Sequence, residues 1–110
     1  METEVTVVRI YLSEADHGRH KNLMQEILNI LHDQHRVKAV TVFRGIAGFG
    51  DTGEVHASDI LRLMVDLPLV IEFYDKPAVV EAALGLLSGL VPAGHIVHWR
   101  ATCPNFNAAR

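Results

Sequence analysis

The sequence has a single cysteine and no apolar run of membrane-spanning length. Cys103 has no second cysteine to pair with, so a disulfide framework within the chain is excluded and a reducing compartment is favoured. A transmembrane helix needs about 20 consecutive apolar residues, and no stretch approaches that length. Residues 1–4 lack the basic and apolar regions of a signal peptide. We therefore expect a cytoplasmic protein without membrane insertion.

Positive charge is scarce as well. Ten Lys and Arg residues stand against 13 Asp and Glu, which gives a net charge of -3 and argues against nucleic acid or an anionic membrane as a partner. Hydrophobic residues make up 49% of the 110 residues, enough to bury one core. The composition therefore predicts a single globular domain over residues 1–110.

Two kinds of apolar periodicity alternate along the chain. Runs of β-branched and aromatic residues predict strands, and apolar residues spaced by three and four predict helices. The expected strands are residues 5–12, 37–43, 69–74 and 95–102; the expected helices are 22–35 and the segment from 76 to about 88; residues 104–110 are expected to be a polar tail. Asn22 and Asp75 are the expected N-caps, and Pro77 the first-turn proline of the second helix.

This order, β-α-β-β-α-β, predicts a ferredoxin-like α+β fold with two helices on one face of a four-stranded antiparallel sheet. Both faces of the expected strands carry apolar side chains; residues 39, 41 and 43 alternate with 40 and 42. A monomer would expose the second apolar face to water. The sequence therefore also predicts an oligomer.

The second strand runs directly into a glycine-rich exit. Gly45, Gly48 and Gly50 follow Phe43 within a few positions, where glycine permits a sharp bend or lets the backbone approach a ligand closely. Residues 47–62 are polar and contain a further glycine, which predicts a long flexible loop. Loops of this length in small domains are often functional.

Five segments together give the chain a family resemblance. They are Arg9–Tyr11, Thr41–Gly50, Val55–His56, Ile60–Leu63 and Asp66–Glu72. Their combination, R-G-I-x-G-F-G, then a histidine, then D-L-P, resembles the PII-like signalling proteins, and most closely a bacterial branch known as a domain of unknown function. The resemblance covers residues 5 to about 99.

The resemblance implies a non-catalytic regulatory homotrimer that binds a small anionic effector in clefts between protomers. An adenine nucleotide is the first candidate, and the long loop would dock on a target protein, a transporter or an enzyme. The implied clefts lie at the loop base and at the turn after the second helix. The candidate ligand-binding residues are Arg44, Gly45, Gly48, Phe49, Gly50, His56, Arg62, Gly89 and Gly94.

The candidate side chains keep alternative interpretations. Arg44 offers a planar donor fork to an anion, or pairs with Glu72 or Asp66 across the sheet. Arg62 likewise either binds an anion or forms a salt bridge with Asp59 or Asp66. His56 is either a ligand contact or a solvated loop histidine.

The chain contains three His-x-x-His pairs. Only one of them, His32 and His35, falls on a predicted helix, where the two side chains share a face. Two ligands alone make a weak zinc site, so no metal site is assigned. A metal-binding trimer of the divalent-cation-tolerance type is the first alternative function.

The last alternative is a small acylphosphatase-like hydrolase, because acylphosphatases share this fold. The chain has no G-x-S-x-G, Walker or H-E-x-x-H motif, and no catalytic residue is assigned.

Overall fold

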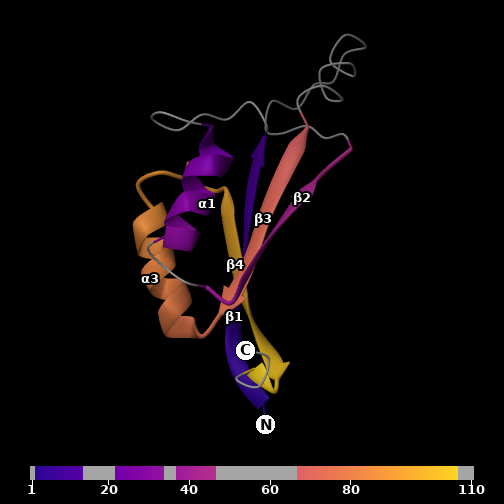
Figure 1. The fold of residues 1–110 in the computed structure, drawn as a ribbon, viewed down its shortest axis with the longest axis vertical. Helices are drawn as coiled ribbons and strands as arrows, with labels where there is room; N and C mark the ends of the chain where they lie inside the picture. Colours follow the sequence, from indigo (N-terminus) through magenta and orange to yellow (C-terminus); the bar gives the residue numbers. More distant parts are fainter. Residues whose placement is uncertain (1, 14–21, 34–36, 47–66, 107–110) are drawn as a thin grey trace.

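The computed structural model describes residues 2–13, 22–33, 37–46 and 67–106 (Figure 1). The elements are β1 (Glu2–Ser13), α1 (Leu23–Asp33), β2 (Ala39–Arg44), β3 (Pro68–Asp75), α3 (Pro77–Leu87) and β4 (Ile96–Pro104). The predicted loop at residues 47–62 lies outside the described residues. No helix of the described part of the chain is long and apolar enough to cross a bilayer.

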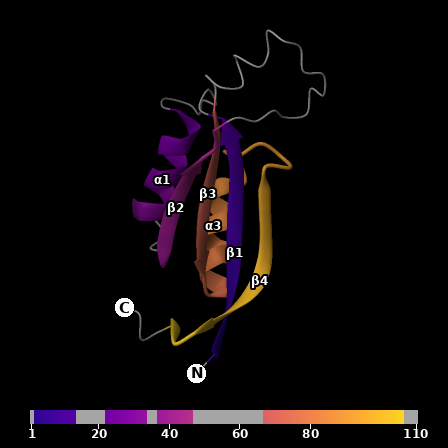
Figure 2. The same ribbon diagram turned by 90° about the vertical axis from the view of Figure 1, so that its right-hand side faces the viewer.

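The four strands form one antiparallel sheet in the order β2-β3-β1-β4. Figure 2 looks onto this sheet, with α3 visible behind β3 and β1. Both helices lie on the same side of the sheet, and β2 and β4 are its two edges (Figures 1 and 2). The predicted ferredoxin-like fold is confirmed, with strands that extend one to three residues beyond most of the predicted ends.

The principal core lies between the sheet and the helices. Every second residue of β3 is buried, at Leu69, Ile71 and Phe73, because successive side chains of a strand point to opposite faces. The buried residues directly opposite them on β1 are Leu12, Ile10 and Val8, respectively. The helices cover these side chains with Leu23, Ile27 and Leu31 of α1 and with Val80, Ala83 and Leu87 of α3.

The two helices begin in different ways. Asn22 caps α1 as expected, because its Oδ1 accepts a hydrogen bond from the Gln25 backbone N–H at 2.8 Å. For α3 the expected cap is wrong by one residue. Lys76 occupies the N-cap position without a side-chain bond, followed by Pro77, while the buried Asp75 accepts from the Lys76 N–H at 2.7 Å. Asp75 therefore belongs to the end of β3.

The chain after residue 103 differs from the patternless tail that its polarity predicts. Pro104 is the last residue of β4, and the Phe106 side chain is only 2% exposed. Lys38 Nζ donates to the Phe106 carbonyl at 2.6 Å and lies 4.2 Å from the centre of its ring, while Tyr74 meets the ring edge-on. One aromatic side chain therefore ties the C-terminal segment to the ends of β2 and β3.

Candidate functional site

The first part of the candidate site is the end of β2, where the predicted glycine-rich exit begins. Gly45 N–H donates to the Pro68 carbonyl at 2.8 Å. A Cβ atom built on Gly45 would lie 2.5 Å from Pro68 Cγ, far inside the normal contact distance of about 3.5 Å. The close approach that requires glycine at this position is therefore an approach to Pro68 of the same chain.

Arg44 directly precedes this contact, as the last residue of β2, opposite Leu69 of β3. Glu72 was one of its two expected ion-pair partners. Glu72 is instead the partner of Arg9, whose Nε lies 2.7 Å from Glu72 Oε1. The other expected partner, Asp66, lies outside the described residues.

The second part of the site is the turn after α3. The backbone N–H groups of Leu90 and Val91 both donate to the Leu87 carbonyl, at 2.9 and 3.0 Å, and the Val91 side chain is buried. Gly94 has φ +84°, a backbone conformation that favours glycine strongly. Gly89 has no atom within 4 Å of an added Cβ. Gly94 is therefore required by the turn, whereas nothing in the described chain requires glycine at 89.

His95 follows this turn and is not among the candidate residues predicted from the sequence. Its Nδ1 lies 2.8 Å from the Tyr11 carbonyl oxygen. A carbonyl oxygen only accepts hydrogen bonds, so Nδ1 carries the hydrogen and Nε2 of the neutral ring carries the lone pair. The backbone thus fixes both the orientation and the tautomer of His95. The one sequence signal was its place directly after Gly94 at the start of a strand.

The two parts of the site lie on opposite edges of the sheet. Arg44 and Gly45 end the edge strand β2, and Gly94 and His95 precede the other edge strand, β4. Two strands, β3 and β1, lie between them. With neighbouring strands about 4.8 Å apart, the separation across the sheet is roughly 14 Å. One chain therefore does not bring the two parts together.

The remaining candidate residues, Gly48, Phe49, Gly50, His56 and Arg62, lie outside the described residues. Among the described residues, no group of three or more His, Cys, Asp or Glu side chains is placed to hold a metal ion.

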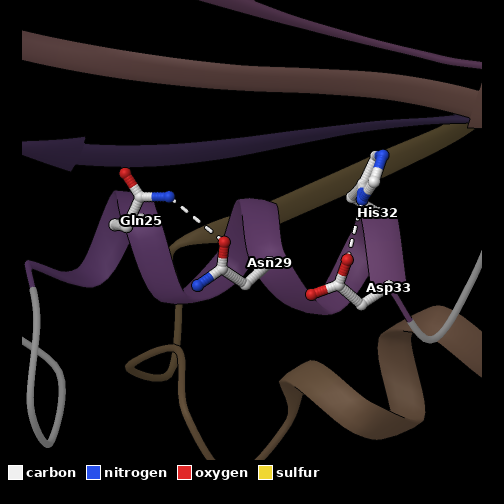
Figure 3. Close-up of polar contacts among 4 residues, drawn as sticks. All are labelled: Gln25, Asn29, His32 and Asp33. Carbon is white, nitrogen blue, oxygen red and sulfur yellow. Dashed lines mark hydrogen bonds and ion pairs between the residues drawn. The ribbon is translucent and has the colours of Figure 1, made fainter.

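Figure 3 shows helix α1 with His32, one member of the His32 and His35 pair. His32 Nδ1 lies 2.7 Å from Asp33 Oδ1, and these side chains are 90% and 66% exposed. Gln25 Nε2 donates to Asn29 Oδ1 at 3.1 Å one turn away. His35, the other half, lies outside the described residues. Contacts as exposed as this one contribute little to stability, and this contact is typical of a solvated helix surface.

Comparison with protein families gives a match over residues 5–103 to DUF190, described as "Uncharacterized ACR, COG1993". The UPF0166 protein MJ1524 of Methanocaldococcus jannaschii is 38% identical over 69 residues, which cover 63% of this chain and 62% of that protein. The match thus spans less than two thirds of that relative. A UPF0166 protein of Aquifex aeolicus is 29% identical, over 76% of this chain and 78% of that protein.

Solved structures with the same fold are PII-like proteins and a divalent ion tolerance protein. CPII of Thiomonas intermedia K12, bound to ADP, AMP and acetate, has a TM-score of 0.59 at 16% identity, over 94% of this chain and 89% of that chain. The divalent ion tolerance protein CutA1 of Ehrlichia chaffeensis has a TM-score of 0.58 at 13% identity, over 96% and 85%.

A PII-like signalling protein of Thermus thermophilus has a TM-score of 0.53 at 11% identity, over 93% of this chain and 89% of that chain. At such low sequence identities, these similarities support a shared fold and nothing further. The family match covers nearly the whole described chain and coincides with the resemblance found in the sequence: the chain belongs to the DUF190 family and has the fold of the PII-like proteins.

Proposed function

We propose that this protein is a non-catalytic, PII-like regulatory protein that binds a small anionic effector in clefts between copies of the chain. An adenine nucleotide is the first candidate effector. The segment 47–62 would dock on a target protein, a transporter or an enzyme, in a manner that depends on effector occupancy. The observation that carries the proposal is the division of the candidate site between the two edges of one sheet.

The strand directions support a site completed by a neighbouring chain. β2 and β1 run one way and β3 and β4 the other, since all neighbouring strands are antiparallel. Rotating copies about an axis parallel to the strands sets β2 of one chain beside β4 of the next, in antiparallel orientation. Gly45 at the end of β2 and His95 at the start of β4 then lie at the same end of the joined sheets. A homotrimer of this kind would form three identical clefts.

The exposure of β2 supports the same arrangement. All six residues of the strand are exposed, although its sequence, Ala-Val-Thr-Val-Phe-Arg, is typical of a buried strand. A hollow of about 870 Å³ separates β2 from α1, with Leu28, Val40 and Val42 among the residues that line it. An edge strand with apolar side chains on both faces is a surface that proteins usually cover.

The chemistry at the two edges suits an anionic ligand with a polar base or sugar. Arg44 brings a guanidinium, which matches phosphate and carboxylate in geometry. His95 Nε2 accepts a hydrogen bond when the ring is neutral and donates one when the ring is protonated. CPII of Thiomonas intermedia K12 has been seen with ADP, AMP and acetate, and with ADP and bicarbonate, and all of these ligands are anions.

The second candidate is a metal-binding protein of the divalent-cation-tolerance type, which the fold similarity to CutA1 favours. Its ligands would have to include side chains from the segments outside the described residues or from a neighbouring chain.

Titration calorimetry tests the proposal. The unmodified protein is titrated with ADP, AMP, bicarbonate and Zn²⁺, and the binding anion is then titrated into Arg44→Ala and His95→Ala. Gln25→Ala, at an exposed position of α1, is the matched control. We expect an anion to bind the unmodified protein with one site per chain. Its affinity should be lower for both edge variants and unchanged for the control. Binding of Zn²⁺ alone would favour the second candidate, and an anion bound equally by all variants would refute the cleft.

A further inference from the structure

The ring of His95 is held at one nitrogen and open at the other. Its Nδ1 donates to the Tyr11 carbonyl at 2.8 Å, and no residue in the described part of the chain bonds Nε2. The backbones of the same two residues are joined as well, because the Tyr11 N–H donates to the His95 carbonyl at 2.9 Å. The direction of Nε2 is therefore set by the end of β1, and adding a proton to Nε2 leaves the bond at Nδ1 in place.

The described surroundings of this ring offer no carboxylate to hold it in its charged form. Residues 82–94, which make up the second half of α3 and the turn after it, contain no charged residue. On β1 the titratable groups are the Tyr11 phenol and, two residues earlier, the guanidinium of Arg9. Arg9 is occupied by Glu72, since its Nε donates to Oε1 at 2.7 Å, and this bond is the main reason that the pKa of Arg9 is raised. On β4 the nearest titratable group is His98.

The two charge states of an imidazole act on an anion in opposite ways. Histidine is the side chain whose charge normally changes between about pH 5 and pH 8. In the neutral ring, Nε2 presents a lone pair to an anionic oxygen, which is unfavourable. In the protonated ring, Nε2–H donates to the same oxygen, and a charged donor forms a stronger hydrogen bond than a neutral one. With Nδ1 already bonded, His95 is therefore an anion ligand only when its ring is protonated.

Arg44, at the other edge of the sheet, differs in this respect. A guanidinium stays charged at every pH near neutrality. In the proposed cleft, Arg44 from one chain and His95 from its neighbour would thus supply one permanent and one conditional positive charge. The permanent charge sets a minimum affinity for the anion, and the conditional charge adds to it only when the ring is protonated.

We infer that His95 couples effector binding to proton uptake, so that the cleft holds an oxygen anion more tightly as the pH falls from about 8 to about 6. The inference rests on the proposed function and names the regulation of its site. The sign follows from linkage: the bound anion favours the protonated ring, so its affinity rises as the pH falls through the titration of that ring. The ligand class follows as well. The effector presents a phosphate or carboxylate oxygen to Nε2, because a ligand that presents an N–H or O–H donor there would bind the neutral ring and weaken as the pH falls.

The test is titration calorimetry with ADP at about pH 6, 7 and 8 on the unmodified protein, His95→Gln, Arg44→Ala and His98→Gln. Glutamine keeps a hydrogen-bonding amide but does not titrate, and the exposed His98 of β4 is the matched histidine control. ADP itself titrates in this range, so the pH dependence of each form is compared with that of His95→Gln. Between pH 8 and pH 6 the affinity of the unmodified protein should rise about tenfold more than that of His95→Gln. His98→Gln should behave like the unmodified protein, and Arg44→Ala should bind more weakly by a similar factor at each pH.

Nitrogen NMR of the His95 ring in the unmodified protein keeps the test decisive even if His95→Gln folds poorly. At one pH near neutrality, ADP should shift the ring from the neutral towards the protonated form. Equal pH dependence in the unmodified protein and His95→Gln, or a ring that stays neutral with ADP bound, would overturn the inference while leaving the proposed function intact. If ADP, AMP and bicarbonate fail to bind at every pH, the proposed function is refuted and the inference falls with it.

Discussion

Gly45→Ala tests whether the glycine at the end of β2 is required by the fold. The new methyl carbon would lie 2.5 Å from Pro68 Cγ and 3.3 Å from Cδ, so β2 and β3 must separate by about 1 Å to reach normal contact. The proline ring is covalently tied to its own backbone, and the Gly45 N–H to Pro68 bond of 2.8 Å would lengthen with the shift. Overpacking of this kind costs about 1–3 kcal/mol.

A smaller effect opposes this loss. Replacing glycine by alanine restricts the unfolded chain and stabilises the folded state by about 0.4–1 kcal/mol where the native conformation suits alanine. The net expectation for Gly45→Ala is a loss of about 1–2 kcal/mol. For a domain of this size the melting temperature should fall by roughly 4–8 °C.

Gly85→Ala is the matched control, because Gly85 lies inside α3 and an added Cβ meets nothing within 4 Å. Alanine favours the helix interior over glycine by about 0.8–1 kcal/mol, so this variant should melt at a higher temperature. Both variants are measured by calorimetry at one protein concentration, because assembly makes stability concentration-dependent. A Gly45→Ala variant as stable as the unmodified protein would refute the steric explanation of this glycine.

Two further predictions concern the C-terminal segment and the Arg9–Glu72 hydrogen bond. Phe106→Ala should lower the free energy of unfolding by about 3 kcal/mol, because the side chain is 2% exposed; Leu86→Ala, at 41% exposure, should change it by about 0.5 kcal/mol or less. Urea unfolding of both checks this, and equal losses would contradict it. The raised pKa of Arg9 means that its contribution to stability is complete below the ordinary arginine pKa and is lost only as the pH rises through the raised value. Unfolding of the unmodified protein and of Arg9→Met between about pH 6 and pH 9 should therefore differ by a constant amount, and a difference that changes across this window would show that another group is responsible.

The sequence predicted the elements well where periodicity and side-chain size agree. β3 alternates strictly between buried and half-buried residues, and the apolar spacing of α1 gives its three buried positions directly. The tertiary contacts were beyond such patterns. Phe106 stands alone in a polar segment, and its burial depends on Lys38 and Tyr74, which are distant in the sequence.

Only part of the candidate site could be predicted from the sequence, because the rest depends on tertiary contacts. Gly94 is recognisable beside Pro92 as a turn glycine, but the contact of Gly45 with Pro68 requires the pairing of β2 with β3. The partner of Glu72 depended on register. Arg9 lies directly opposite Glu72, and Thr41 rather than Arg44 occupies the opposite position on β2. The role of His95 rests on a hydrogen bond to a backbone atom of another strand, which no spacing rule reveals.

The most direct test of the central claim is thermal denaturation of the unmodified protein against a panel of effectors, with and without EDTA. The panel contains ADP, AMP, ATP, bicarbonate, acetate and Zn²⁺. Because a ligand at 100 times its dissociation constant stabilises the folded state by about 2.7 kcal/mol, the melting temperature should rise by roughly 10 °C with at least one nucleotide, whether or not EDTA is present. Stabilisation by Zn²⁺ alone, abolished by EDTA, or no stabilisation by any anion, would contradict the account.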